Sequence, residues 1–309
     1  MKSRVAVTAL FAALVAGPPA RAERAQSSTV RVVVHGASVS AYRDGGYGQW
    51  LAAACKNIRV DNVSKEKLGA TELRERFVEQ VLQRGRVNPK AQESWLLFMV
   101  GLNSVGTPER TNVEVARTFK LARDAGFRTM GLTINPWGSE RDVRWRGANG
   151  LEWLEHSQKV VDFLMGRLTP HQAFGRRAAA QTAYLPGQLP ELAVDVWDAS
   201  LRDRAAPPRP EQPLERQVRS SPWVTAKIAE LQGTAREAAL QQWITRAATL
   251  PRWFMRPELI GADGAHPNSV GHKEIAGAIC ARAPASWGCD CRATERLTWD
   301  PRTNKAVPQ

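Results

Sequence analysis

A short segment that is apolar at almost every position constrains the fold of this chain more than any other feature. It is Ser94-Trp-Leu-Leu-Phe-Met-Val100. Successive side chains of a strand point to opposite faces of a sheet, so such a strand buries both faces. Strands covered on both faces are typical of parallel sheets. The segment therefore predicts a parallel sheet with helices on either side.

Strands and helices alternate around this segment. Runs rich in Val and Ile predict strands, and apolar residues three or four positions apart predict helices. Thr71 is the predicted N-cap of the second helix. The predicted strands cover 32–34, 57–63, 94–100, 128–134 and 192–197, and the predicted helices cover 47–55, 72–84, 112–125 and 151–168. This order predicts an α/β fold, a three-layer α/β/α sandwich around a doubly wound parallel sheet with flavodoxin-like topology.

Two distant segments carry residues suited to acyl transfer. The first strand runs into His35-Gly-Ala-Ser38, where a turn of small residues exposes a hydroxyl at the carboxyl end of the strand. Open α/β sheets bind their ligands at that edge. Far downstream, Asp263 and His266 stand three residues apart. A serine nucleophile needs a base, and the base needs an anion to orient it, so Ser38, His266 and Asp263 are the predicted catalytic residues.

Four blocks of the sequence resemble those of the SGNH hydrolases, also called the GDSL family. The blocks are Gly36-Ala37-Ser38 for the usual Gly-Asp-Ser, Leu68-Gly69-Ala70-Thr71 for the glycine block, Gly101-Leu102-Asn103-Ser104 for Gly-x-Asn-Asp, and Asp263 to Asn268 for Asp-x-x-His-Pro-Asn. The last block is reproduced in full. Ala37 and Ser104 replace two carboxylates of the family pattern, which bears on loop geometry and substrate preference.

The resemblance implies a serine hydrolase that acts on esters. Ser38 would be the nucleophile, His266 the general base and then acid, and Asp263 the orienting carboxylate. The oxyanion hole would consist of the backbone N–H groups of Ser38 and Gly69 and the side-chain amide of Asn103, three donors around one developing charge. Hydrolysis through an acyl-enzyme on Ser38 needs no metal and no cofactor.

The first 22 residues predict a signal peptide. Lys2 and Arg4 form a basic start, an apolar stretch follows, and Ala20-Arg21-Ala22 is a small-x-small cleavage site. The alternative is a membrane anchor, but the apolar run is too short to span a bilayer. We therefore expect export to the periplasm or the medium, with no integral membrane segment in the mature chain, and one hydrolase domain over residues 23–309.

Export makes disulfides plausible for Cys55, Cys280, Cys289 and Cys291. Cys289 and Cys291 are too close to pair comfortably with each other. Either Cys55 and Cys280 each pair with one of them, or Cys55 pairs with this tail and one thiol stays free. A zinc site is disfavoured because no C-x-x-C or paired-histidine spacing is present. In a flavodoxin-like sheet the first and last helices cover the same face, which favours a link from Cys55 to the tail.

The charge of the chain bears on its substrate. Residues 1–22 contain Lys2, Arg4 and Arg21 and no acid, so their removal lowers the net charge from +13 to +10. A basic protein suits a polyanionic partner. The arginines are scattered, which favours a solvated basic surface over a nucleic-acid site. Export, charge and aromatic content favour an acetylated polysaccharide or cell-wall polymer; lipid or small-ester hydrolysis, acyl transfer to an alcohol, and a binding module without turnover are alternatives.

An insertion at about 203–255 interrupts the alternation. Its first part, 203–222, has five prolines among arginines and predicts an exposed irregular linker. Residues 223–250 predict one or two amphipathic helices with Trp243 on the apolar side. Because the insertion directly precedes Asp263 and His266, it is either a lid over the substrate or a segment that packs against the sheet. Of the other histidines, His35 and His272 are expected to be structural.

Overall fold

The structure is a computed structural model that describes residues 29–85, 87–100, 102–146, 148–178, 181–209 and 214–309. The predicted signal peptide, residues 1–22, lies outside the described residues. Within the described part of the chain, no helix combines the length and the apolar character needed to cross a bilayer.

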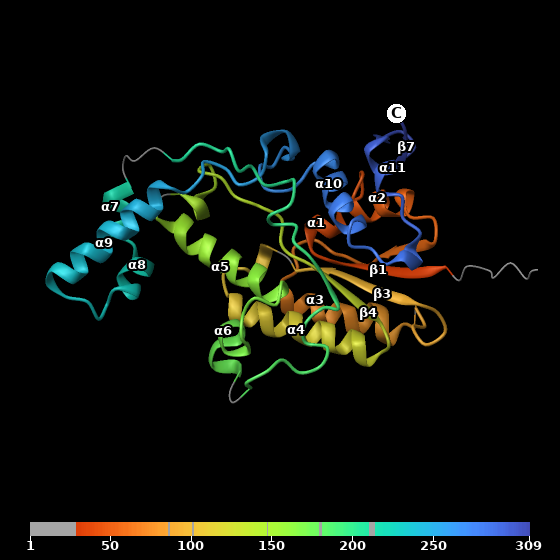
Figure 1. Ribbon diagram of the computed structural model, residues 1–309, viewed down its shortest axis with the longest axis horizontal. Helices are drawn as coiled ribbons and strands as arrows, with labels where there is room; N and C mark the ends of the chain where they lie inside the picture. The colour runs from red at the N-terminus through yellow and green to blue at the C-terminus, as the bar shows by residue number, and fades with distance from the viewer. Residues whose placement is uncertain (1–28, 86, 101, 147, 179–180, 210–213) are drawn as a thin grey trace, which may run out of the picture.

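Five parallel strands form the centre of the fold (Figure 1). They are β1 (Val30–Gly36), β2 (Ile58–Asn62), β3 (Ser94–Met99), β4 (Arg128–Leu132) and β5 (Leu192–Val194), in the order β2-β1-β3-β4-β5. The flavodoxin-like order is therefore confirmed. In the register of β1 and β3, His35 lies opposite Phe98 and Gly36 opposite Met99, so both strands end at the same edge.

Helices cover both faces of the sheet. One face carries α3 (Ala70–Phe77), α4 (Pro108–Asp124) and α5 (Asn149–Leu164), and the other carries α2 (Tyr47–Ala54) and α10 (Ser269–Cys280). Alternate residues of one strand supply the two cores: Leu96 and Phe98 face the first, Trp95 and Leu97 the second. All four are at most 1% exposed. This is the arrangement that the apolar run at 94–100 predicts.

Two helix boundaries differ from the prediction. The N-cap of α3 is Gly69 and not Thr71, which lies inside the first turn; no side chain caps this end, and a π-helix at Val78–Gln83 completes the predicted helical stretch. Helix α4 begins at Pro108, four residues before the predicted start. A proline has no N–H to leave unpaired and has a helical φ, so it suits the first turn.

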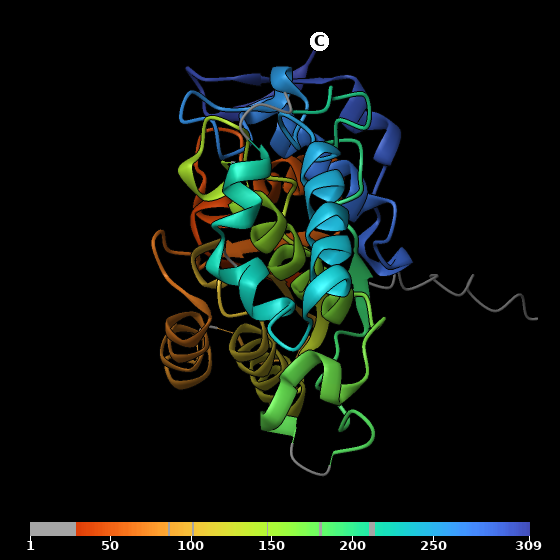
Figure 2. The same ribbon diagram turned by 90° about the vertical axis from the view of Figure 1, so that its left-hand side faces the viewer.

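The insertion forms α7 (Leu214–Arg219), α8 (Pro222–Lys227) and α9 (Gly233–Ala248). Part of the predicted irregular linker is thus helical. Figures 1 and 2 show the three helices at one end of the molecule, with α7 and α9 side by side against α5. Their apolar residues extend the core around α5, and Trp243 packs on Trp223 with ring centroids 5.1 Å apart. The helices therefore contact the helical layer around α5.

The tail folds back over α2 and α10. It contains α11 (Cys291–Glu295) and an antiparallel hairpin of β6 (Leu297–Asp300) and β7 (Lys305–Pro308), which the sequence analysis did not predict. Cys55 pairs with Cys289 and Cys280 with Cys291. This is one of the two patterns that the spacing allows, and it includes the expected link from Cys55 to the tail. Two short α-helices, α1 (Ser38–Ala41) and α6 (Pro170–Phe174), complete the described α-helices.

Candidate active site

Ser38 follows β1 directly, as the first residue of α1. The turn between them is tight: a Cβ on Gly36 would lie 2.2 Å from Ser40 Oγ and 2.6 Å from the Met99 carbonyl oxygen. Only glycine fits such a close approach. The Ser38 hydroxyl is therefore held at the carboxyl edge of the central strand pair.

Ser38, His266 and Asp263 form a chain of hydrogen bonds. Ser38 Oγ lies 2.7 Å from His266 Nε2, and His266 Nδ1 lies 2.5 Å from Asp263 Oδ2. A carboxylate only accepts hydrogen bonds, so the imidazole donates from Nδ1. In the neutral ring Nε2 is then an acceptor, and the Ser38 hydroxyl donates to it. This is the tautomer that a general base for serine needs.

The loop that carries Asp263 and His266 is fixed by its own hydrogen bonds. Asp263 Oδ1 accepts from the backbone N–H groups of Ala265 and His266, both at 3.0 Å. Asn268 caps α10 by accepting from the Gly271 N–H at 3.0 Å, and its amide donates to the Glu258 carbonyl at 2.8 Å. These bonds hold the imidazole in place from both ends of the loop.

The same contacts keep Asp263 ionised. Its partial burial would raise the pKa of the carboxyl, but the N–H groups of His266 and Ala265 and the His266 ring outweigh this and hold the pKa below its usual value. The side chain of Asp263 is 55% exposed and that of His266 33%. The pair is thus open to solvent, so water can reach the imidazole.

Gly69 and Asn103 lie in a neighbouring part of the same edge. Gly69 precedes α3, and Asn103 lies in the 3-10 turn Leu102–Ser104 that follows β3. The Asn103 amide donates to the Leu68 carbonyl at 3.1 Å. Both residues line a hollow of about 300 Å³, whereas Ser38 lines a separate, smaller one. Leu102 connects the two regions: it lines Ser38's hollow and a second hollow shared with Asn103.

No family model matches the chain. Among curated proteins it is similar to a GDSL lipase from Mycobacterium tuberculosis, with 31% identity over 116 residues. The match covers 29% of the chain and 49% of the lipase, so the chain spans about half the length of the curated relative it matches.

Among solved structures it is similar to a lipolytic protein of the G-D-S-L family from Veillonella parvula, with 11% identity, a TM-score of 0.44, and 82% and 97% of the two chains covered. It is also similar to a catalytic mutant of an acetylxylan esterase from Geobacillus stearothermophilus, with 14% identity, a TM-score of 0.45, and 85% and 96% covered.

The chain thus matches a GDSL lipase over part of its sequence, in agreement with the resemblance of its four sequence blocks to the SGNH, or GDSL, hydrolases. Its two departures from the SGNH pattern differ in their surroundings. Ala37, in place of the usual aspartate, is 4% exposed and packs in the core beneath α3 and α4. Ser104 keeps a backbone role, since its carbonyl accepts from Thr111 Oγ1 at 2.6 Å, whereas its own Oγ is buried without a partner among the described residues.

The SGNH motifs do not include Asn135, which lines the hollow beside Ser38. This hollow has a volume of about 10 Å³, and its other walls include Met99, Val100 and Leu102. Asn135 is 1% exposed, and its Oδ1 has no hydrogen-bond partner among the described residues. It lies three residues beyond the end of β4. Its place after a strand of the sheet was the signal that could have drawn attention to it.

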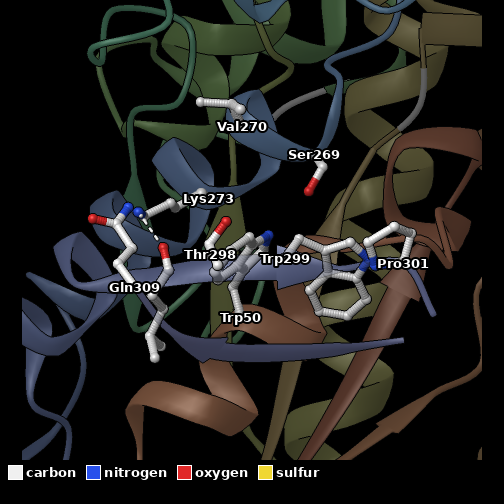
Figure 3. Close-up of a pocket in the computed structure, with 9 residues that line it drawn as sticks. Trp50, Ser269, Val270, Lys273, Thr298, Trp299, Pro301 and Gln309 are labelled. Atoms are coloured by element: carbon white, nitrogen blue, oxygen red, sulfur yellow. Dashed lines mark hydrogen bonds between the residues drawn. The ribbon is translucent and has the colours of Figure 1, made fainter. Parts of the chain in front are cut away.

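Figure 3 shows another hollow near the His266 loop, between α10 and the C-terminal hairpin. Its volume is about 400 Å³. Trp50 and Trp299 form part of its wall, with ring centroids 5.5 Å apart, and Ser269 belongs to the first turn of α10. Lys273 reaches toward the hairpin and donates to the Leu297 carbonyl at 2.7 Å. The hollow thus combines indole rings with hydroxyl and ammonium donors.

His35 and His272 are both fully buried, as expected for structural residues. His35 lies 2.8 Å from the Leu73 carbonyl through Nε2 and stacks on Phe98. Burial lowers its pKa to about 4, against the opposing effect of that carbonyl. His272 stacks on Tyr42 with centroids 4.5 Å apart, and burial lowers its pKa to about 3, with a smaller contribution from His266. Both imidazoles are therefore neutral near pH 7.

The lowered pKa values of these two histidines predict that the free energy of unfolding decreases in mild acid. Both pKa values are lower in the folded state than the 6.5 of a free imidazole. The stabilising contribution is therefore complete above pH 6.5 and is lost as the pH falls toward 4, because the unfolded chain takes up protons first. Between pH 6.5 and 5 the two groups together should lower the free energy of unfolding by about 3 kcal/mol.

Urea unfolding of wild type and His272→Phe across this pH range measures the effect. Between pH 6.5 and 5 the variant should lose about 1.5 kcal/mol less of its free energy of unfolding than wild type, since the contribution of His272 is gone. His171→Gln, a change at an exposed histidine, serves as the control and should keep the wild-type slope. An unchanged slope in His272→Phe would show that His272 does not titrate in this way.

Proposed function

We propose that the protein is an exported serine esterase that removes short acyl groups, foremost O-acetyl groups, from a carbohydrate or cell-wall polymer. The observation that carries this proposal is the hydrogen-bonded chain from Asp263 through His266 to the Ser38 hydroxyl. Each member has the donor or acceptor state that acyl transfer requires.

In the proposed mechanism, Ser38 Oγ attacks the ester carbonyl while its proton passes to His266 Nε2. Asp263 stabilises the imidazolium. The N–H groups of Ser38 and Gly69 and the Asn103 amide stabilise the negative charge on the former carbonyl oxygen. The Asn103 amide would then donate to this oxygen in place of the Leu68 carbonyl. His266 returns the proton to the departing alcohol, and the acyl group remains on Ser38. Water activated by His266 then releases the acid.

The size of the hollow beside Ser38 supports a short acyl group. At about 10 Å³ it has room for little more than a single water molecule. Buried apolar residues such as Met99 and Val100, at 2% and 1% exposure, form part of its wall. A long acyl chain would need this core to open. The curated relative is named a lipase, which supports a longer acyl chain as the alternative.

Two features support a polymer outside the cytosol as the substrate. The described cysteines are all paired, and structural disulfides are typical of oxidising compartments outside the cytosol. The hollow with Trp50 and Trp299 lies close to the catalytic loop and offers indole faces with hydroxyl groups. Indoles present a large apolar face with a polar edge, which suits the faces and hydroxyl groups of sugar rings.

Replacement of the proposed nucleophile is the first test. Ser38→Ala should lower the hydrolysis of para-nitrophenyl acetate by a factor of roughly 10⁴ or more, because no acyl-enzyme can form. Ser286→Ala, at an exposed serine of the tail, should retain wild-type rates. A serine-directed phosphonate should label wild type at Ser38. If wild type hydrolyses no ester and stays unlabelled, the protein is a binding module on this fold.

A series of para-nitrophenyl esters tests the acyl length. Wild type should prefer acetate and lose about tenfold or more in kcat/KM by octanoate, since the hollow beside Ser38 cannot hold the chain. Leu102→Ala removes part of its wall and should shift the optimum toward butyrate. A wild-type optimum at octanoate or longer would favour the lipase alternative and exclude the acetyl esterase.

Removal of the side-chain amide tests the proposed oxyanion role of Asn103. Asn103→Asp keeps the shape but removes the donor, and Asn103→Ala removes both. Each should lower kcat by about 10²–10³, with little change in KM, since the interaction forms only in the transition state. Asn88→Ala, at an exposed asparagine elsewhere, is the matched control. Wild-type kcat in Asn103→Asp would rule out an oxyanion role for this residue.

A further inference from the structure

We infer that the region beside Asn103 binds a carboxylate of the substrate polymer through Lys67 and Arg110, with Arg144 at its border. The substrate would then be an acylated polysaccharide that contains uronic acids. This inference rests on the proposed esterase function and specifies its substrate class. It concerns residues outside the SGNH motifs.

Two adjoining hollows form this region. Their volumes are about 300 and 430 Å³, and they share four lining residues, namely Lys67, Asn103, Ser104 and Thr107. Arg110 lines only the first, whereas Arg144 and Trp153 line only the second. The volumes are in the range of ligand-binding clefts. The second hollow shares Leu102 with the hollow of Ser38, so the region adjoins the proposed reaction centre.

The two cations of the first hollow have no ion-pair partner among the described residues. Glu72 lines the same hollow without an ion pair to either cation among the described residues, so the charged lining residues Lys67, Arg110 and Glu72 have a formal net charge of +1. Arg110 has one weak contact, from its guanidinium to Thr71 Oγ1 at 3.4 Å. Nearly all of its donors therefore remain available. A guanidinium presents paired N–H groups that match a carboxylate, so Arg110 is well suited to bind one.

Arg144 contrasts with these cations because it is already held. Two hydrogen bonds to Asp142, of 3.1 and 2.7 Å, offset its charge. Its guanidinium lies over the Trp137 ring, 4.6 Å from the centroid, and 6.0 Å from that of Trp153. Arg144 therefore provides a rigid, polar border, while Lys67 and Arg110 supply the charge that is not neutralised.

The backbone of Lys67 supplies a second, independent observation. Its φ is +65°, in the left-handed region, where Asn304 is the other non-glycine residue among those described. That conformation costs a residue with a Cβ about 1–2 kcal/mol. Strained backbones of this kind cluster at functional sites. The conformation places Lys67 at the wall of both hollows, two residues before Gly69.

The surroundings of Trp153 favour a sugar unit as the group that carries the carboxylate. Its half-buried indole borders the second hollow together with Ser104 and Thr107. A Cβ on Gly106 would lie 3.1 Å from the Trp153 ring, so the glycine leaves the ring edge uncovered. A uronic acid unit provides hydroxyls and a ring for these groups and a carboxylate for the cations. The polymer's charge also complements the net charge of +10 that is expected after removal of residues 1–22.

Hydrolysis of two acetylated polymers tests the inference. The enzyme would be assayed on acetylated homogalacturonan, which is anionic, and on acetylated xylan free of uronic acids. At low salt wild type should have at least about tenfold higher kcat/KM on the anionic polymer, and added salt should reduce this ratio. Lys67→Asn, which tolerates a positive φ, and Arg110→Gln should each reduce the ratio about three- to fivefold, through KM. Arg282→Gln, at an exposed arginine of the tail, should leave it unchanged.

A binding measurement separates this inference from the esterase proposal. Calorimetry would compare trigalacturonate with xylotriose, neither of which has an ester. Binding of trigalacturonate that weakens in Arg110→Gln but not in Arg282→Gln supports the site even if no ester is hydrolysed. Equal binding of both sugars, or equal hydrolysis of both polymers by an active enzyme, overturns the inference and leaves the esterase proposal intact. Stronger binding of a poly(glycerol phosphate) than of a galacturonate oligomer of equal charge overturns the assignment to uronic acids.

Discussion

The hydrogen bond between Ser38 and His266 depends on the whole fold, because its partners are 228 residues apart. Ser38 is positioned by β1, which lies between β2 and β3 in the sheet. His266 is positioned by the loop before α10, which packs on α2, the helix that follows Ser38's own turn. The two disulfides link α2 and α10 to the same tail. A short contact is thus maintained by long-range packing and covalent links.

The features that the sequence predicted correctly are those encoded by neighbouring residues. The apolar composition of residues 94–100 indicates a strand that is covered on both faces. The small residues around Gly36 indicate a tight turn. The loop from Asp263 to Asn268 folds through its own hydrogen bonds, so its spacing in the sequence already contains its geometry. The pairing of Ser38 with His266 followed from the need of a serine nucleophile for a base and from the SGNH resemblance, since the loop of His266 precedes α10 and does not follow a strand of the five-stranded sheet.

The remaining features depend on contacts between distant segments, which no local pattern encodes. The hairpin of β6 and β7 was missed because its stability comes from packing on Trp50 as well as from its own short strands. Thr71 has the side chain of a good N-cap, but the backbone enters the helix two residues earlier, at Gly69. Asn135 and Arg110 are ordinary polar residues in the sequence. Only the fold places one beside Ser38 and the other beside Asn103.

The two sides of the proposed centre differ in a way that bears on its chemistry. On the acyl side, core residues leave about 10 Å³, so a substrate gains little from a longer chain. On the side of Asn103, the hollows are more than an order of magnitude larger and contain polar and charged groups. In the proposed reaction, binding energy would therefore come from the alcohol part of the ester, and it would orient a small acyl group against Ser38. An acetyl group attached to a large, polar chain is the kind of ester that this asymmetry favours.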